Sequence, residues 1–182
     1  MNSGITGAAV CTLQFLNPFQ VMKMSYHSQI VNVDNTIQVI VFNLGEERYG
    51  VEISQVKEII LPTQITRIPN MPDFVEGVLN LRGQIAAIIN LRNRLGKEPK
   101  KNDENTRIIV VEYNNATIGM MVDSVSEVRY LSSQNIEEIP RFLALRADSR
   151  FLKGVGKLED GLLTLMDLKE LFSEDELKEI RG

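Results

Sequence analysis

The chain has 182 residues, 43% of them hydrophobic and 24% charged, which is the composition of an ordinary globular protein with one domain or two small ones. A net charge of −4 and a pI of about 5.2 disfavour a nucleic-acid binder, which usually carries a basic footprint, and also a general membrane-surface role. A single Cys and a single His exclude an intrachain disulfide and a multi-histidine metal site, so we expect no metal and no cofactor.

The N-terminal stretch lacks the pattern of a packed fold. Met1 to Val21 carries no charge, whereas a secretory signal begins with a positively charged region. We expect residues 1–36 to be a disordered or non-native tail, with Met22 or Met24 as an alternative start, and the intact mass of the native protein tests this. No run approaches the roughly 18 apolar residues that span a bilayer. Without an export signal or disulfides, the expected location is the cytoplasm.

Short strand patterns follow from Ile37 onward. Apolar, β-branched runs bounded by Gly, Asn or Pro predict strands at 38–44, 48–53, 107–113 and 117–122, and similar strand–turn–strand patterns occur at 74–92 and 154–168. Ser54 is a candidate N-cap for a short helical turn, and 123–128 resembles it. The polar segment 97–106 predicts an exposed loop between two halves. Ser173 and Glu176 form a capping box, which predicts a C-terminal helix within 173–182.

One arginine interrupts the most apolar segment of the chain, Phe74 to Arg92. Two apolar runs flank Leu81-Arg82-Gly83, and ionised side chains are rarely buried without a partner. One interpretation is a tight turn that leaves Arg82 in water without a function. The other is an exposed cation that a rigid turn directs at a partner.

The two halves of the chain match each other. Residues 50–59 align with 119–128 at an offset of 69, and residues 77–91 align with 154–168 at an offset of 77. One strand-rich unit is therefore used twice, which predicts an all-β fold of two small five-stranded barrels, at roughly 37–96 and 107–172. The turns differ, because Arg82-Gly83 is cationic whereas Glu159-Asp160 is acidic. This difference favours two unlike faces for two unlike partners.

Several of these segments together resemble the CheW family of chemotaxis coupling proteins. The resemblance rests on GVLNLRGQIAAIINLR (77–92), on VKEI (56–59) and on FNLGEERYGVEI (42–53), and it runs from about residue 38 to 172. It implies two SH3-like β-barrels packed together, no enzymatic activity, and an adaptor role. The implied partners are the cytoplasmic tip of a chemoreceptor and the regulatory domain of the histidine kinase CheA. Ala87 and Asn90 depart from the family's usual Pro and Asp, at positions we do not assign to partner binding.

The resemblance also implies roles for individual residues. Arg82, with Leu81 and Gly83 beside it, corresponds to the arginine implicated in assembly of the signalling complex, and it could pair with Glu58 or Glu127. The remaining candidates are wall residues of a receptor groove between the barrels (Val56, Glu58 and Ile59 facing Val125 and Val128) and two weaker kinase contacts (Tyr49 and Val51). Apolar residues at such spacing also suit a core, so groove and core both stay open for them.

Three other functions compete with this one. A CheW-like scaffold could serve a different two-component pathway, in motility or gene control. A small barrel could bind nucleic acid, although the acidic charge and the scarcity of aromatic residues disfavour it. An enzyme using only carboxylates such as Glu52 and Glu58 is weaker still, because exposed strand and turn positions explain both residues. We therefore expect a protein that is not an enzyme.

Overall fold

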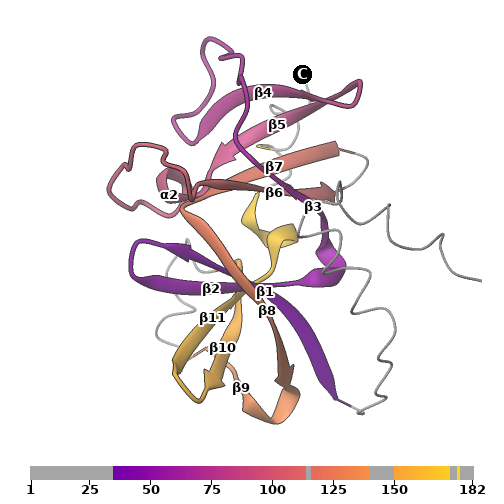
Figure 1. Cartoon of the computed structure of the whole chain (residues 1–182), viewed down its shortest axis with the longest axis vertical. Helices are drawn as coiled ribbons and strands as arrows, with labels where there is room; N and C mark the ends of the chain where they lie inside the picture. Colours follow the sequence, from indigo (N-terminus) through magenta and orange to yellow (C-terminus); the bar gives the residue numbers. More distant parts are fainter. Residues whose placement is uncertain (1–34, 114–115, 140–149, 173–175, 177–182) are drawn as a thin grey trace, which may run out of the picture. The chain divides into compact units, whose positions relative to one another are not determined.

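The computed structural model describes residues 35–113, 116–139, 150–172 and 176, and these residues form an all-β fold as expected (Figure 1). The strands are β1 (Thr36–Leu44), β2 (Glu47–Glu52), β3 (Val56–Ile60), β4 (Val75–Leu81), β5 (Gln84–Asn90), β6 (Arg107–Tyr113), β7 (Ala116–Val122), β8 (Ser124–Ser132), β9 (Ile136–Glu137), β10 (Leu152–Leu158) and β11 (Gly161–Met166). The short helical elements are η2 (Ile53–Gln55), α2 (Leu91–Arg94), η3 (Ser133–Asn135) and η4 (Leu168–Leu171).

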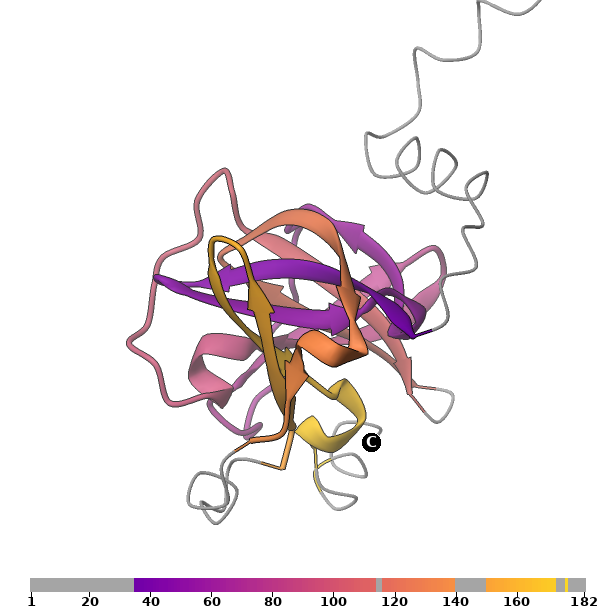
Figure 2. The ribbon, with the colours of Figure 1, turned by 90° about the horizontal axis from the view of Figure 1, so that it is seen from below.

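The strands form two curved sheets (Figure 2), and we call each a barrel although its edge strands are not hydrogen-bonded to each other. One sheet has five strands in the order β3-β6-β7-β5-β4, all drawn from residues 56–122, and we call it the contiguous barrel. The other has six strands in the order β8-β1-β2-β11-β10-β9, from residues 36–52 and 124–166, and we call it the discontinuous barrel. Its sixth strand, β9, is only two residues long.

The expected division into one barrel from 37–96 and another from 107–172 is wrong. The chain leaves the discontinuous barrel through η2 after β2 and returns to it at Asp123 after β7, so each barrel takes strands from both halves. Local strand patterns identify the strands but not their hydrogen-bonding neighbours, which long-range register decides. The contiguous barrel is inserted between β2 and β8.

The strand registers follow the duplication despite this exchange. β11 pairs with β2 in parallel with Leu165 opposite Gly50, and β5 pairs with β7 in parallel with Ile88 opposite Gly119. The offset of 77 residues relates Leu165 to Ile88, and the offset of 69 relates Gly50 to Gly119, so the two pairs are equivalent in the duplication. The same shift relates the two antiparallel pairs β1–β8 and β3–β6, and each carries a register irregularity at the equivalent place. The two barrels are therefore built on one plan.

The helical turns predicted after Ser54 and Asp123 are largely strands. Only 53–55 forms a 3-10 turn, and it has no side-chain cap, whereas β3 and β8 follow directly. Their β-branched residues pair in extended conformation with β6 and β1, and this tertiary pairing overrides a weak capping signal. The irregularity beside Lys57 then places Val56 and Ile59 on the same side of β3.

Among the described residues, three apolar clusters hold the fold together. One lies inside the contiguous barrel around Ile88 and Ile108, and another lies inside the discontinuous barrel around Val39 and Leu163. The third takes residues from both barrels, and we call it the inter-barrel core: Ile40, Phe42, Leu44, Tyr49, Val51, Val56, Ile89, Leu91, Ile109, Val111, Ile118, Met120, Val122, Met166, Leu168, Leu171 and Phe172.

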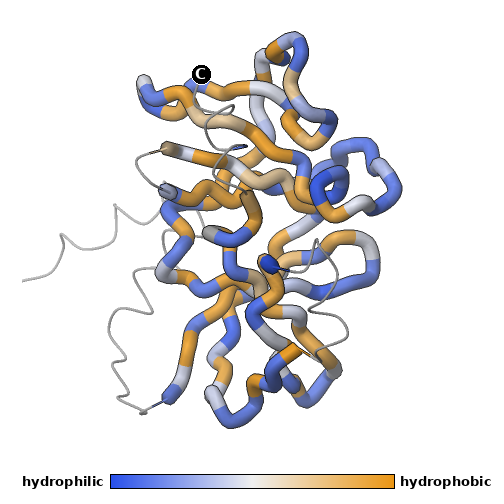
Figure 3. The backbone as a smooth tube through the Cα atoms, turned by 180° about the vertical axis from the view of Figure 1, so that it is seen from behind, coloured by the Kyte–Doolittle hydropathy of each residue, from blue (hydrophilic) through white to orange (hydrophobic). Residues whose placement is uncertain are grey.

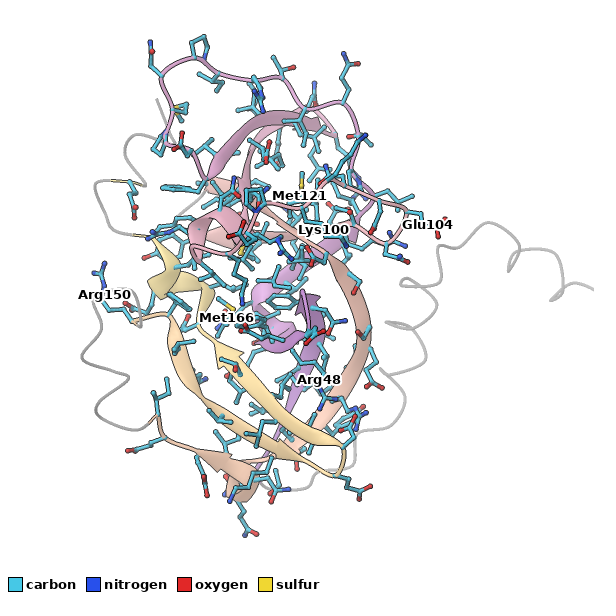
Figure 4. All side chains as sticks on the ribbon, turned by 90° about the vertical axis from the view of Figure 1, so that its left-hand side faces the viewer. Arg48, Lys100, Glu104, Met121, Arg150 and Met166 are labelled. Carbon is cyan, nitrogen blue, oxygen red and sulfur yellow. The ribbon has the colours of Figure 1, made fainter. Side chains whose placement is uncertain are left out.

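Strands β1, β6 and β7 each face a barrel interior on one side and the inter-barrel core on the other. In β6, for example, Ile108 and Val110 belong to the contiguous barrel, whereas Ile109 and Val111 belong to the inter-barrel core. A strand buried on both faces has an unbroken apolar sequence. Figure 3 shows such apolar stretches along the strands of both barrels. Figure 4 shows the sticks packed between the strands near Met121 and Met166, whereas Glu104 on the 97–106 loop projects outward.

Two sequence expectations fall mostly outside the described residues. The expected tail, 1–36, overlaps them only at its end, where β1 begins at Thr36. Of the expected C-terminal helix within 173–182, the structure describes Glu176 alone, in helical conformation. Among the described residues, no helix has both the length and the apolar character needed to cross a membrane.

Candidate partner-binding site

Arg82 and Gly83 form the two-residue turn between β4 and β5. Their φ angles are 53° and 87°, the pair of positive values that defines a type I′ hairpin turn. The Gly83 amide donates a hydrogen bond of 2.8 Å to Oδ1 of Asn80, which fixes the turn from within. A left-handed backbone is uncommon for arginine. The turn leaves the Arg82 side chain 78% exposed.

Arg82 is tied to the opposite edge of its barrel. Its Nη2 donates to Oε2 of Glu58 at 2.8 Å, and the Glu58 side chain is only 19% exposed. Because β3 and β4 are the two edge strands of the sheet, this ion pair bridges the opening of the contiguous barrel. Of the two partners predicted for Arg82, the structure pairs it with Glu58, whereas Glu127 pairs with Arg129. The turn and the ion pair together hold an exposed guanidinium in one place.

The discontinuous barrel has a comparable ion pair with its charges inverted, although Glu159 and Asp160 lack the positive φ values of Arg82 and Gly83. Its equivalent turn is Glu159-Asp160, and Oδ2 of Asp160 accepts hydrogen bonds from Arg48 at 2.6 Å and from Arg129 at 3.4 Å. The bond from Arg48 is the main reason that the pKa of Asp160 lies below its usual value. Arg129 lies on edge strand β8 and also pairs with Glu127 at 2.7 Å. The two turns therefore differ in charge as expected, and each is held by side chains of the opposite charge.

Three apolar candidates lie at the border of the inter-barrel core. Ile59 on β3 and Val125 and Val128 on β8 are all half-buried and pack against that core. β3 belongs to the contiguous barrel and β8 to the discontinuous one. We call these three residues the apolar rim, and both barrels contribute to it.

Three other predicted contacts have buried side chains. Tyr49 is 6% exposed, Val51 0% and Val56 6%, and all three belong to the inter-barrel core. The Tyr49 ring stacks on Phe42, and its hydroxyl donates to Glu47 at 2.6 Å. Burial raises the pKa of Tyr49, and the bond to Glu47 adds to this effect. Tyr49 and Val51 are thus not surface contacts for a kinase, and Val56 supports the rim from beneath.

Sequence reasoning missed two exposed aliphatic residues beside the turns. Ile85 on β5 is 73% exposed and Leu162 on β11 is 63% exposed. They are equivalent in the duplication, because an offset of 77 converts one into the other. That offset was the one available signal, since both lie in apolar strand patterns that predict burial. Leu81, on the other side of the turn, is half-buried against the interior of the contiguous barrel.

The groups gathered at this site are of kinds that suit protein binding. The described residues hold no group of three or more His, Cys, Asp or Glu side chains close enough to bind a metal ion. What the site offers is one positioned guanidinium, its carboxylate partner and the apolar rim. Exposed arginine and adjacent apolar area are typical of protein interfaces.

Replacing Gly83 with alanine should destabilise the protein by about 1 kcal/mol, because a residue with a Cβ is strained at positive φ. No atom lies within 4 Å of the added Cβ, so crowding contributes nothing. Urea denaturation followed by circular dichroism measures the loss. A loss above about 3 kcal/mol would contradict the view that the turn faces open space.

Two small barrels with open edges around a shared core, and with an exposed cation at the rim of one of them, define a small all-β interaction module. A family model for the CheW-like domain matches residues 38–176. The chain belongs to the CheW family. It is 40% identical over 140 residues to the chemotaxis protein CheW of Klebsiella aerogenes, covering 77% of this chain and 84% of that protein. It is 32% identical over 142 residues to the chemotaxis protein CheW of Helicobacter pylori, covering 78% and 85%.

A solved structure supports the same conclusion. The crystal structure of the scaffolding protein TtCheW from Thermoanaerobacter tengcongensis superposes with a TM-score of 0.70 at 35% identity, covering 77% of this chain and 94% of that one. The resemblance of residues 77–92 and their neighbouring segments to the CheW family is thereby confirmed, as is the expected two-barrel fold.

Proposed function

We propose that this protein is a non-catalytic adaptor of chemotaxis that couples chemoreceptors to the histidine kinase CheA. The observation that carries the proposal is the geometry of Arg82, a cation 78% exposed yet fixed by a type I′ turn and by Glu58. A turn without a binding role would be better served by Asn or Gly at this position. The strained and exposed arginine is explained by a partner that uses it.

The chemoreceptor tip is the partner we assign to the apolar rim. A helical hairpin presents an apolar stripe, and such a stripe docks in a groove flanked by aliphatic side chains. Ile59, Val125 and Val128 supply those side chains from two barrels, and each is half-buried rather than fully covered. Leu81, Gly83 and Glu58 then serve mainly to position Arg82 for a partner that docks on the apolar rim.

The second partner is the regulatory domain of CheA. The relatives that share the CheW-like domain are named chemotaxis proteins, and one of them is described as a scaffolding protein. A scaffold needs more than one contact surface, and Arg82 and the apolar rim offer two of unlike chemistry, one cationic and one aliphatic. We expect this assembly to form on the cytoplasmic side of the membrane, where a receptor tip is presented.

Co-sedimentation tests the proposal. A receptor cytoplasmic fragment, CheA and this protein are mixed, and both the pellet composition and the kinase activity are measured. We expect CheA to enter the pellet only when this protein is present, with a change in kinase activity. A chain that binds neither component contradicts the adaptor role in chemotaxis, and capture of a different kinase would favour another two-component pathway.

A further inference from the structure

Two connections join the barrels within residues 35–172. The first is η2, and the second is Asp123, the single residue between β7 and β8. Near the first, Oε1 of Gln55 accepts a hydrogen bond of 3.3 Å from the Leu168 amide, a neutral contact. The second is held by charge.

Asp123 is bonded from both barrels at once. Its Oδ2 accepts a hydrogen bond of 2.7 Å from the Gly45 amide, in the β1–β2 turn of the discontinuous barrel. The same oxygen accepts one of 2.6 Å from Nη1 of Arg92, in α2 of the contiguous barrel. The Asp123 side chain is 11% exposed and that of Arg92 is 14% exposed, so water screens this ion pair only weakly.

Three further contacts reinforce the connection. Lys97, just beyond α2, pairs with Glu47 at the start of β2, and its Nζ lies 5.7 Å from the centre of the Tyr49 ring. Arg92 is itself oriented by a hydrogen bond of 2.7 Å from its Nε to the Glu98 carbonyl. Every one of these contacts except the last joins residues of the contiguous barrel to the β1–β2 hairpin. We call Asp123, Arg92, Lys97, Gly45 and Glu47 the inter-barrel clasp.

We propose that the inter-barrel clasp sets the angle between the barrels and thereby the spacing of the apolar rim. The rim joins Ile59 of one barrel to Val125 and Val128 of the other, so its spacing depends on how the barrels are oriented. Arg92 and Asp123 are positioning residues, because they act through the rim rather than by touching a partner. The part that concerns partner binding rests on the proposed function.

The Arg92–Asp123 pair of the clasp differs from an ion pair within one barrel, because its loss would free the orientation of one barrel relative to the other. The Arg48–Asp160 pair has the same distance of 2.6 Å, but both of its residues belong to the discontinuous barrel. Breaking it frees a turn and leaves the barrel angle alone. Breaking Arg92–Asp123 instead leaves a partly buried charge without its partner at a connection between barrels. These two Arg–Asp pairs therefore make a matched comparison.

The test measures the distance between the barrels directly. In the full chain with Cys11→Ser, spin labels are attached at Glu112→Cys on β6 and Lys157→Cys on β10, which are exposed positions in different barrels. Double electron–electron resonance should give a narrow distance distribution, and Asp123→Asn should widen it. Asparagine keeps an oxygen for the Gly45 amide, so the variant removes mainly the charge. Arg92→Gln should give the same widening, whereas Asp160→Asn should leave the distribution unchanged.

Affinity for a receptor cytoplasmic fragment is measured on the same variants. We expect Asp123→Asn to weaken binding by between about twofold and thirtyfold, the range usual for residues that act on a site through structure. Asp160→Asn should stay within about twofold of the parent chain. An unchanged distance distribution, or a wider one with unchanged affinity, overturns the inference. If the parent chain does not bind the fragment, the proposed function fails, and the distance distributions still decide whether the clasp fixes the barrels.

Discussion

Replacing Arg82 with asparagine should remove most of this protein's capacity to assemble the receptor–kinase complex while leaving the protein folded. The guanidinium is 78% exposed and held in one place, which is the condition under which an interface residue contributes most to binding. A hot-spot residue is worth about 2 kcal/mol or more, so we expect a loss of about 30-fold or more in affinity. Co-sedimentation with the receptor fragment and CheA measures it.

The choice of asparagine separates binding from folding. Asparagine tolerates the left-handed backbone that Arg82 adopts, so the type I′ turn should survive. The lost ion pair with Glu58 is solvent-exposed on the arginine side and contributes at most about 1 kcal/mol to stability. Lys157→Asn is the matched control, because Lys157 is also an exposed cation in a surface ion pair, with Glu137 at 2.6 Å. Equal assembly by Arg82→Asn and the parent chain would remove Arg82 from the interface.

The parts of the fold that the sequence predicted are those encoded locally. The β-branched run from Arg107 to Tyr113 predicts a strand with the bounds that β6 has. The turn at Arg82-Gly83 was also predictable, because a glycine and a charged residue interrupt two apolar runs. By contrast, the exchange of strands between the halves has no local signature, since β2 has the same pattern whichever strand lies beside it.

The candidate site was predictable for its charged residues but not for its apolar ones. The sequence offered Glu58 and Glu127 as partners for Arg82, and the structure pairs it with Glu58. Val51 and Ile59 have the same kind of side chain, yet Val51 is fully buried and Ile59 is only half-buried. Only the position of each strand in its sheet distinguishes them, because β2 is central and β3 is an edge.

Replacing Phe42 with alanine should produce the largest loss of stability. The Phe42 side chain is 1% exposed, belongs to the inter-barrel core and stacks on Tyr49 with ring centres 5.7 Å apart. Removing a buried phenyl ring costs about 3–5 kcal/mol, from lost burial and from the cavity left behind. Small proteins have only about 5–15 kcal/mol of stability in total. Urea denaturation of Phe42→Ala should therefore show a strongly lowered midpoint, whereas Ile85→Ala, at an exposed apolar position, should change stability by about 0.5 kcal/mol or less.

The loss should spread to both barrels, because the inter-barrel core takes side chains from each. Phe42 lies on β1 of the discontinuous barrel, but Ile109 and Val111 of β6 belong to the same cluster. Unfolding either barrel alone would expose that shared apolar surface on the other, so the two should unfold as one cooperative unit. The Phe42→Ala substitution should then lower the protection of β6 amides against hydrogen exchange as much as that of β1 amides. Unchanged protection in β6 would mean that the contiguous barrel is stable without the shared core, and that the clasp at Asp123 carries more of the connection between the barrels.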